Sequence, residues 1–367
     1  MNKTIIKSFS VWPLRTPLNQ SFRTALGEHK TLDNLLFTIT LEDKTIGAGE
    51  AAVATHITGE TIERTKLNLN IIGQSLLGSD VRDYLKISKK LHERLKGNAC
   101  ALAAIETALM DALTRHLKIP LWKIFGEKPR KLQSDITIVI ADLKETESSV
   151  RKYLRRGFRA FKVKIGRDED LDCKRVLVVK KCAPKSDIYL DANQGYTATQ
   201  TLQVVKYLKA RGVQVSLLEQ PVPREDFEGL KRVTRLAGVP VCADESARSI
   251  EDVERIIKEK AAQVINIKLM KTGLVQGRKI ALLARAHGLD LMIGGMMESS
   301  LAMTASAHLA AGLGCFKYID LDTPFFLKKG FQRNPFLSSR GIYDLSKVKA
   351  GIGIDFRKKL ASQRVKS

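Results

Sequence analysis

"FKVKIG", residues 161–166, has the composition of a short buried strand that ends at Gly166. Side chains alternate between the two faces of a strand, so Lys162 and Lys164 point in the same direction. Two buried amines on one face are costly unless nearby groups compensate their charge. The segment therefore predicts a strand whose polar face belongs to a charged site.

Eight segments of this kind follow one another along the chain, separated by amphipathic stretches typical of helices. Successive segments begin about 25 to 30 residues apart, which is the length of one strand–helix–strand unit. This alternation predicts an α/β fold with a parallel sheet, and eight strands predict a closed barrel. The expected strands are 135–140, 160–165, 187–192, 215–220, 240–245, 264–269, 291–296 and 317–322.

The rest of the chain predicts a second, smaller unit. Alternating apolar and polar residues at 32–41 and 45–53 indicate an antiparallel hairpin, and residues 58–117 have helical periodicity, with Asn98 as the expected N-cap of the clearest helix. Proline, glycine and charged residues at 118–131 mark the boundary. We therefore expect a capping domain at 1–130, a barrel at 131–322, and a C-terminal segment at 323–367 that returns to the capping domain.

Composition excludes several classes of protein. No apolar run approaches the ~18 residues of a membrane span, and the first residues lack the pattern of a signal peptide. The five cysteines are dispersed, which favours a reducing cytoplasm and argues against a thiolate metal site. The net charge of +23 raises the possibility of nucleic-acid binding, but no nucleic-acid-binding motif is present and aromatic residues are only 6% of the chain. We interpret the charge as a solvated basic surface that attracts anionic ligands.

Charged residues recur where the expected strands end, and in a barrel those ends surround the active site. Asp191, Glu219 and Asp244 end three adjacent strands. Oxygen ligands without histidine or cysteine favour Mg²⁺. The alternative is three separate salt bridges at the rim. We prefer the metal because the lysines flank the acidic group in sequence order instead of lying within it.

Lys164 and Lys268 lie on opposite sides of this acidic group in strand order. A neighbouring ammonium such as that of Lys162, and a nearby Mg²⁺, each disfavour protonation of a lysine and so make it a usable base. Two bases on opposite sides predict removal of a proton from one face of a carbon and its return to the other. The metal would stabilise the enediolate formed next to a carboxylate. This chemistry is racemisation or epimerisation.

Several motifs, in order, carry a resemblance: KVKIG (162–166), LDANQGY (190–196), LLEQPV (217–222), CADESA (242–247), NIKLMKTG (266–273) and GGMMESSLAMTASAH (294–308). Nearly the whole chain resembles the enolase superfamily, muconate-lactonizing-enzyme subgroup. In that superfamily a lysine or histidine base works with Mg²⁺. The resemblance implies a modified (β/α)₇β TIM-type barrel with an α+β capping domain, the metal ligands Asp191, Glu219 and Asp244, and the acid/base pair Lys164 and Lys268.

Within the subgroup, DLDTP (320–324) resembles the DxD signature of the dipeptide epimerases, in which two carboxylates bind the substrate's α-ammonium. Asp320 and Asp322 have an alternative interpretation as caps of the following turn. The resemblance implies a Mg²⁺-dependent epimerase acting on the second residue of a dipeptide. The alternatives are an N-acylamino acid racemase or o-succinylbenzoate synthase of the same superfamily, and, from another class, a basic anion-binding protein on a non-catalytic barrel.

Substrate specificity is expected from two loops that resemble the mobile loops of this group, at 17–31 and 55–61. If Arg23 pairs with a substrate carboxylate, the substrate resembles L-Ala-D/L-Glu, a peptidoglycan fragment; if it does not, a hydrophobic or broader dipeptide fits as well. We expect self-association into a homo-oligomer and no nucleic-acid or membrane partner. The remaining candidate residues are Lys162, Thr137, Gly295 and Met296 as substrate contacts, Asn193 as a support of the metal ligands, and Glu298 as a residue that orients a lysine or caps a helix.

Overall fold

The computed structural model describes residues 3–126, 128–328 and 333–355. Eight parallel strands form one sheet in chain order, and the sheet curls so that the backbone N–H of Asp135 donates to Ile319 O at 2.8 Å, which joins its two edges. The strands are β5 (Ile136–Ile138), β6 (Ala160–Lys164), β7 (Asp187–Asp191), β8 (Leu217–Glu219), β9 (Val241–Ala243), β10 (Val264–Ile267), β11 (Asp290–Ile293) and β12 (Tyr318–Ile319).

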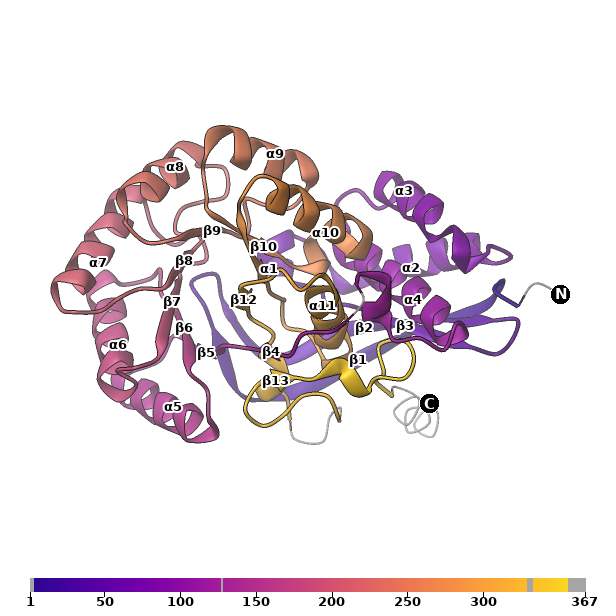
Figure 1. Cartoon of the computed structure of the whole chain (residues 1–367), viewed down its shortest axis with the longest axis horizontal. Coiled ribbons are helices and arrows are strands. Elements are labelled where there is room, and N and C mark those ends of the chain that lie inside the picture. The colour runs from indigo at the N-terminus through magenta and orange to yellow at the C-terminus, as the bar shows by residue number, and fades with distance from the viewer. Residues whose placement is uncertain (1–2, 127, 329–332, 356–367) are drawn as a thin grey trace.

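One helix separates each pair of successive strands, and α5 to α9 form an arc outside the strands in Figure 1. The helices are α5 (Leu143–Arg156), α6 (Glu169–Cys182), α7 (Ala198–Ala210), α8 (Phe227–Leu236), α9 (Ile250–Glu259), α10 (Leu269–Ala286) and α11 (Ser300–Leu313). The (β/α)₇β arrangement that the resemblance implied is confirmed. None of the helices in the described chain is both long and apolar enough to cross a membrane.

The interior of the barrel is layered because each strand places alternate residues inward. Six buried residues at one level form a cluster: Tyr189, Leu217, Cys242, Val264, Met292 and Tyr318. Two residues further along the chain from each of these lie five polar residues and a glycine: Asp191, Glu219, Asp244, Asn266, Asp320 and Gly294. The barrel therefore has an apolar floor, and its carboxyl-terminal mouth is charged.

The capping domain is a three-stranded antiparallel sheet covered by helices, at the right of Figure 1. Its strands are β1 (Ile6–Arg23), β2 (Glu28–Leu41) and β3 (Ile46–Ala51), and its helices are α1 (Thr55–Thr58), α2 (Ile62–Leu76), α3 (Tyr84–Arg94) and α4 (Ala99–His116), with a 3₁₀ turn η1 (Val81–Asp83). The expected hairpin is the β2–β3 pair. Strand β3 lies very close to α4, because Gly47 and Gly49 leave no side chain between the two backbones.

Asn98 occupies the N-cap position of α4, but its side chain makes no capping hydrogen bond. The amide of Asn98 donates instead to Glu60 Oε1 at 3.0 Å. Glu60 Oε1 also accepts from the backbone N–H of Cys100 at 2.9 Å. Asn98 is therefore the N-cap residue, as expected, but a glutamate distant in sequence supplies the acceptor for the start of this buried helix.

The C-terminal segment contacts both parts of the molecule. Strand β13 (Ile342–Tyr343) pairs with β4 (Leu132–Gln133), which comes just before the first barrel strand. Near the capping domain, the backbone N–H of Ile352 donates to Asp111 of α4 at 2.7 Å. Three short 3₁₀ turns complete this region: η2 (Leu121–Ile124), η3 (Thr323–Phe325) and η4 (Leu345–Lys347). Residues 356–367 of the expected segment lie outside the described residues.

Candidate active site

Strand register brings the first two predicted ligands together. Lys164, Asp191 and Glu219 are aligned across β6, β7 and β8 at the ends of the strands. Lys164 Nζ donates to Asp191 Oδ2 at 2.6 Å and to Asn193 Oδ1 at 3.0 Å. Asp191 and Glu219 are completely buried. The side chain of Asn266, on β10, donates to Glu219 Oε1 at 2.8 Å.

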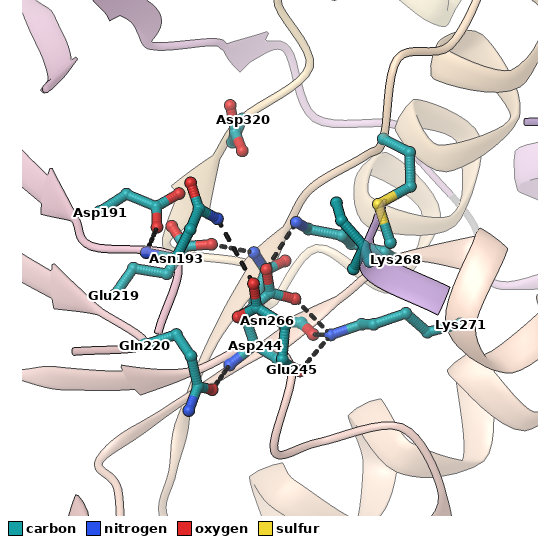
Figure 2. A network of polar contacts seen from close by, with 12 residues as sticks. Asp191, Asn193, Glu219, Gln220, Asp244, Glu245, Asn266, Lys268, Lys271 and Asp320 are labelled. Carbon is teal, nitrogen blue, oxygen red and sulfur yellow. Dashed lines mark hydrogen bonds and ion pairs between the residues drawn. The ribbon is translucent and has the colours of Figure 1, made fainter. Parts of the chain in front are cut away.

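Asp244 follows β9 and is held by two lysines from the start of α10, as Figure 2 shows. Lys268 Nζ lies 2.6 Å from Asp244 Oδ2. Lys271 Nζ lies 2.6 Å from Asp244 Oδ1 and also donates to the backbone oxygens of Asp244 and Asn266. Lys164 and Lys268 therefore stand on opposite sides of the three strands that carry the predicted ligands.

Lys162 lies one level deeper than Lys164, level with Tyr189 in the register of β6 and β7. Its Nζ atom is 3.1 Å from Asp191, 2.7 Å from Glu219 and 2.7 Å from Asp320. The expectation that lysines only flank the acidic group is therefore wrong for Lys162. Its inward-facing position on a deeper level of the barrel directs the ammonium into the carboxylates.

Charge around these groups shifts their pKa values in opposite directions. Burial raises the pKa of Asp191, but the ammonium groups of Lys164 and Lys162 outweigh it and bring the value to about 2. Burial and the neighbouring charge of Asp191 raise the pKa of Glu219 to about 7. Burial would lower the pKa of Lys268, yet Asp244 and Glu219 raise it above its ordinary value. The lysines thus stabilise the charged form of Asp191, and the acids stabilise the charged form of Lys268, whereas burial and the neighbouring Asp191 favour the neutral form of Glu219.

The donor set fits Mg²⁺. Carboxylate oxygens are the ligands that this hard cation prefers, and the acids at the mouth outnumber the amines. Seven buried carboxyl groups face four ammonium groups, an excess of three acids that favours cation binding: Asp135, Asp191, Glu219, Asp244, Glu245, Asp320 and Asp322 against Lys162, Lys164, Lys268 and Lys271.

Lysine ammonium groups contact Asp191, Glu219 and Asp244 in this structure, so Mg²⁺ would compete with these ion pairs. Within the described chain, Asp135, Asp320 and Asp322 form a group of acids close enough to share a metal ion. Each contributes one carboxylate oxygen, and these oxygens lie within 4.8 Å of one another.

A cavity at the mouth contains most of the predicted substrate contacts. The predicted contacts that line it are Thr137, Lys162, Gly295, Met296, Asp320 and Asp322. The predicted acid/base residues Lys164 and Lys268 line it too, as does Asn193. The apolar part of the remaining wall consists of Phe22, Leu26 and Ile57 from the capping domain and Met297 and Met303 from the barrel. Thr24, Gly27, His29 and Thr323 complete the lining. Both predicted loops therefore reach the cavity.

Arg23 does not reach this cavity. Its guanidinium pairs with Glu28 at 3.0 Å, and the side chain lines an outer groove beside α5. The outward direction follows from strand alternation, because the neighbouring Phe22 points inward. In the described chain no arginine lines the cavity, so the argument for a glutamate side chain in the substrate loses its support.

Glu298 and Asn193 have roles that differ in detail from those expected. Glu298 Oε1 accepts from the backbone N–H of Met296 at 2.7 Å and so holds the turn beside the cavity. Because this N–H donates to Glu298, it is not available to a substrate. Asp191 Oδ1 accepts from the backbone N–H of Asn193 at 2.9 Å, while the Asn193 side chain reaches Lys164 and Glu245. Glu245 therefore lies on the site side, because β9 ends at Ala243 and strand alternation stops there.

Sequence reasoning missed several residues that build the site. Gln220 has a left-handed backbone (φ 31°), and its side-chain oxygen accepts from the backbone N–H groups of Asp244 and Ser246 at 3.0 and 3.1 Å. It thereby ties the end of β8 to the end of β9. Lys271 and Asn266 were visible only as parts of the NIKLMKTG motif. Asp135 gave no signal at all, since an acid before a short strand resembles a turn residue.

Two family models match this chain. Residues 4–126 match the mandelate racemase / muconate lactonizing enzyme N-terminal domain, and residues 145–360 match the enolase C-terminal domain-like family. The chain belongs to the enolase superfamily. The resemblance to this superfamily, which the motifs at the strand ends indicated, is confirmed.

Relatives of this enolase-superfamily chain are similar over almost their whole length. A hydrophobic dipeptide epimerase from Citrifermentans bemidjiense is 46% identical over 352 residues, which cover 94% of this chain and 96% of the relative. An aromatic dipeptide epimerase from Herpetosiphon aurantiacus is 40% identical, over 96% of this chain and 99% of the relative. The crystal structure of a dipeptide epimerase from Enterococcus faecalis, complexed with Mg and L-Leu-L-Tyr, matches with a TM-score of 0.91 and 30% identity, over 96% of this chain and 99% of the other.

Proposed function

We propose that this protein is a Mg²⁺-dependent dipeptide epimerase that inverts the α-carbon of the second residue, with a preference for apolar side chains at that position. The observation that carries the proposal is that Lys164 and Lys268 line one cavity and lie on opposite sides of the strands that carry Asp191, Glu219 and Asp244. Racemisation at a carbon requires a proton to leave one face and arrive at the other.

Each group at the mouth has a part in this reaction. Asp191, Glu219 and Asp244 would hold Mg²⁺, which supplies positive charge for the substrate carboxylate while the α-carbon loses its proton. One of the two lysines accepts the proton, and the other donates one from the opposite side. Asp320 and Asp322, which line the same cavity, accept hydrogen bonds from the free α-ammonium of the dipeptide.

The apolar wall supports the substrate preference. Phe22, Leu26 and Ile57 lie over the mouth from the capping domain, and Arg23, the residue expected to recognise a glutamate side chain, points away. A hydrophobic side chain gains from burial in such a wall, whereas a carboxylate would lose its hydration there. The names of the two relatives, hydrophobic and aromatic dipeptide epimerase, support the same preference.

The test is incubation with L-Ala-L-Phe in D₂O, with Mg²⁺ and then with EDTA, followed by NMR of the α-protons. We expect deuterium at the α-carbon of the second residue together with the L,D diastereomer, both abolished by EDTA and restored by added Mg²⁺. L-Ala-L-Glu should react at least about tenfold more slowly, as a buried carboxylate without a partner predicts. Absence of exchange in every dipeptide tried would refute the proposal.

The same experiment separates the alternatives. Exchange in N-acetyl-phenylalanine but not in L-Ala-L-Phe would indicate an N-acylamino acid racemase. Such a substrate has no free ammonium to bind at Asp320 and Asp322. No turnover of either substrate, together with tight binding of polyanions, would indicate the non-catalytic anion-binding protein.

Location and assembly are part of the proposal. All five cysteines are free thiols, which supports a reducing compartment, and we place the enzyme in the cytoplasm. Self-association into a homo-oligomer stays a prediction, to be checked by analytical ultracentrifugation.

A further inference from the structure

A buried arginine lies behind one of the two proposed acid/base lysines. Arg175 and Asp172 belong to the first two turns of α6, both side chains are buried, and they form an ion pair. Arg175 Nη1 also donates to the backbone oxygen of Lys164 at 2.9 Å. Neither Arg175 nor Asp172 is among the described residues that line the cavity, so neither contacts the substrate itself.

Lys164 is the last residue of β6, where the strand has lost its neighbour on one side. The pairing of β5 with β6 ends at Val163, so Lys164 extends beyond β5. On the other side, the backbone N–H of Ile165 donates to Asp191 O at 2.9 Å. A buried backbone carbonyl requires a hydrogen-bond donor, and Arg175 supplies one to Lys164. The guanidinium thus replaces a strand as the partner of β6 at Lys164.

Asp172 fixes the chain that follows Lys164. Its Oδ2 atom accepts from the backbone N–H groups of Gly166 and Arg167 at 2.7 and 3.2 Å. The hydroxyl of Tyr196, in the loop after β7, donates to the same oxygen. Gly166 and Tyr196 are the last residues of the KVKIG and LDANQGY motifs, and the proposed reaction alone does not explain them. Asp172 therefore ties the loops after β6 and β7 to α6.

We propose that Arg175 is a positioning residue that, together with Asp172 and Tyr196, holds Lys164 in place for proton transfer at one face of the α-carbon. The inference rests on the proposed function. The ion pair brings no net charge to the mouth, so it acts through geometry. Geometry matters for this step because a displacement of about 1 Å can slow a reaction about a hundredfold.

The network supports one lysine and not the other. Lys268 is the N-cap residue of α10, and its backbone oxygen accepts from the backbone N–H of Lys271 at 2.9 Å. In the described chain, Arg175 and Asp172 make no hydrogen bond with α10 or β10. Loss of the network should therefore impair proton transfer on the Lys164 side and spare the other side, whereas a general loss of folding would affect both sides equally.

Two conservative variants weaken the network in different ways. Arg175→Lys keeps the positive charge beside Asp172, but an ammonium lacks the planar fork that bonds Asp172 and the oxygen of Lys164 at once. Tyr196→Phe removes one hydroxyl and leaves the arginine in place.

The matched control is Arg115→Lys, in α4 of the capping domain. Arg115 also joins an aspartate to a backbone carbonyl, because it pairs with Asp111 at 2.8 Å and donates to Ile354 O at 3.3 Å. It is not among the described residues that line the cavity. The control therefore makes the same replacement in a similar setting away from the lysines.

Each protein is incubated in D₂O with saturating Mg²⁺, starting separately from L-Ala-L-Phe and L-Ala-D-Phe. NMR follows two rates, the uptake of deuterium into the starting diastereomer and the formation of the other diastereomer. The variant Lys164→Ala identifies the diastereomer that still exchanges through Lys268. Thermal melting shows that each variant is folded at the assay temperature.

In Arg175→Lys we expect kcat for epimerisation to fall about tenfold or more in both directions, with KM within about threefold of wild type, because transition-state geometry is lost and substrate binding is not. Exchange in the diastereomer that faces Lys268 should be retained, so its ratio of exchange to epimerisation rises. That ratio should not rise for the other diastereomer. Tyr196→Phe should show the same pattern with a smaller loss, and the control should keep both wild-type ratios.

The inference is overturned if exchange and epimerisation fall by the same factor from either diastereomer in the folded variants, or if both variants keep the wild-type ratios. If Arg175→Lys does not fold, the pattern in Tyr196→Phe decides alone. Failure of the proposed function is a different result, since wild type itself would then show no exchange in any dipeptide, and the inference would fall with it.

Discussion

Lys164 and Lys268 occupy matching positions on the two sides of the acidic group, and each holds one of its aspartates at 2.6 Å. If each serves one face of the α-carbon, Lys164→Ala and Lys268→Ala should both reduce epimerisation by at least about 10³-fold. Exchange of deuterium into one diastereomer should survive in each variant, because the remaining lysine still faces its own side. The measurement is NMR in D₂O, starting separately from the L,L and L,D dipeptides.

The matched control is Lys317→Ala, which removes an ammonium from the opposite end of the barrel, where it pairs with Asp290. This variant should retain activity within about twofold, because an exposed ion pair contributes little. Full epimerase activity in both active-site variants would show that the two-lysine scheme is wrong.

Leu26, in the turn between β1 and β2, forms part of the apolar wall. Leu26→Arg would place a guanidinium where a substrate side chain is expected to lie. The ratio of kcat/KM for L-Ala-L-Glu to that for L-Ala-L-Phe should rise by about tenfold or more, since a charge-assisted pair replaces an apolar contact. Steady-state kinetics with both dipeptides measure this ratio.

Ser21→Arg is the control, because Ser21 lies on the outer groove of the same hairpin and does not line the cavity. It adds the same charge and should leave the ratio unchanged. An unchanged ratio in Leu26→Arg would mean that this wall does not contact the second residue of the substrate.

At the residue scale, the sequence was informative where chemistry repeats at strand ends. Asp191, Glu219, Asp244 and the two lysines, whose roles stay predictions, are predicted as site residues from such repetition. Asp135 and Gln220 are not, because their importance depends on which strands meet at the seam and on a left-handed turn after β8. Such contacts join residues far apart in the chain and leave no local pattern.

The contact between β3 and α4 depends on glycine. A methyl group on Gly49 would overlap the carbonyl oxygen of Ala104 on the buried helix. We expect Gly49→Ala to lower the free energy of unfolding by about 3 kcal/mol, since neither backbone can move away easily. Denaturant unfolding followed by circular dichroism measures the loss.

Gly288→Ala separates this steric effect from backbone strain. Gly288 has a φ of 75° but no atom within 4 Å of an added Cβ. Its replacement should cost only about 1 kcal/mol, the usual penalty of a left-handed alanine. Equal losses in the two variants would contradict the close-contact explanation for Gly49.

Elements were predicted well where their period was strong. The eight barrel strands and the amphipathic helices between them were found from alternation alone. The capping of α4 was not, because the group that caps it, Glu60, comes from a segment 40 residues away in the sequence. Local sequence patterns identify the N-cap position. They cannot identify a residue far away in the sequence that accepts the hydrogen bond in place of the N-cap side chain.

His308 joins three parts of the molecule. Its Nδ1 accepts from the backbone N–H of Trp122 in η2 at 3.0 Å, and its Nε2–H donates to Ile352 O in the C-terminal segment at 3.1 Å. Burial lowers the pKa of His308 to about 4. Protonation would place a second N–H against that of Trp122, so the folded protein keeps the ring neutral.

This pKa predicts acid sensitivity of the whole fold. Below an unfolded-state value of about 6.5, the unfolded chain binds a proton that the folded chain does not, so stability falls as the pH drops. The loss should reach about 3 kcal/mol between pH 6.5 and 4. His308→Asn cannot titrate, so the stability difference between wild type and variant should shrink over this range, measured by thermal melting. A constant difference would show that His308 does not titrate as described.

On the scale of the whole molecule, the sequence predicted both units and the family, because ordered motifs span nearly the entire chain. It did not predict how the C-terminal segment pairs with β4 at the barrel entrance, or that His308 fastens this segment to α11 and η2. In the sequence His308 is only the last residue of the GGMMESSLAMTASAH motif. Its hydrogen bonds with Trp122 and Ile352 are evident only in the folded structure, because these residues lie far apart in the chain.

Three residues of the apolar cavity wall, Phe22, Leu26 and Ile57, belong to the capping domain, whereas both lysines and the acids belong to the barrel. After a gene duplication, substitutions in the β1–β2 hairpin of one copy can therefore change its peptide specificity without altering the lysines and acids of the barrel. Diversity of peptide preference among descendants of one ancestral barrel is the evolutionary consequence of this division.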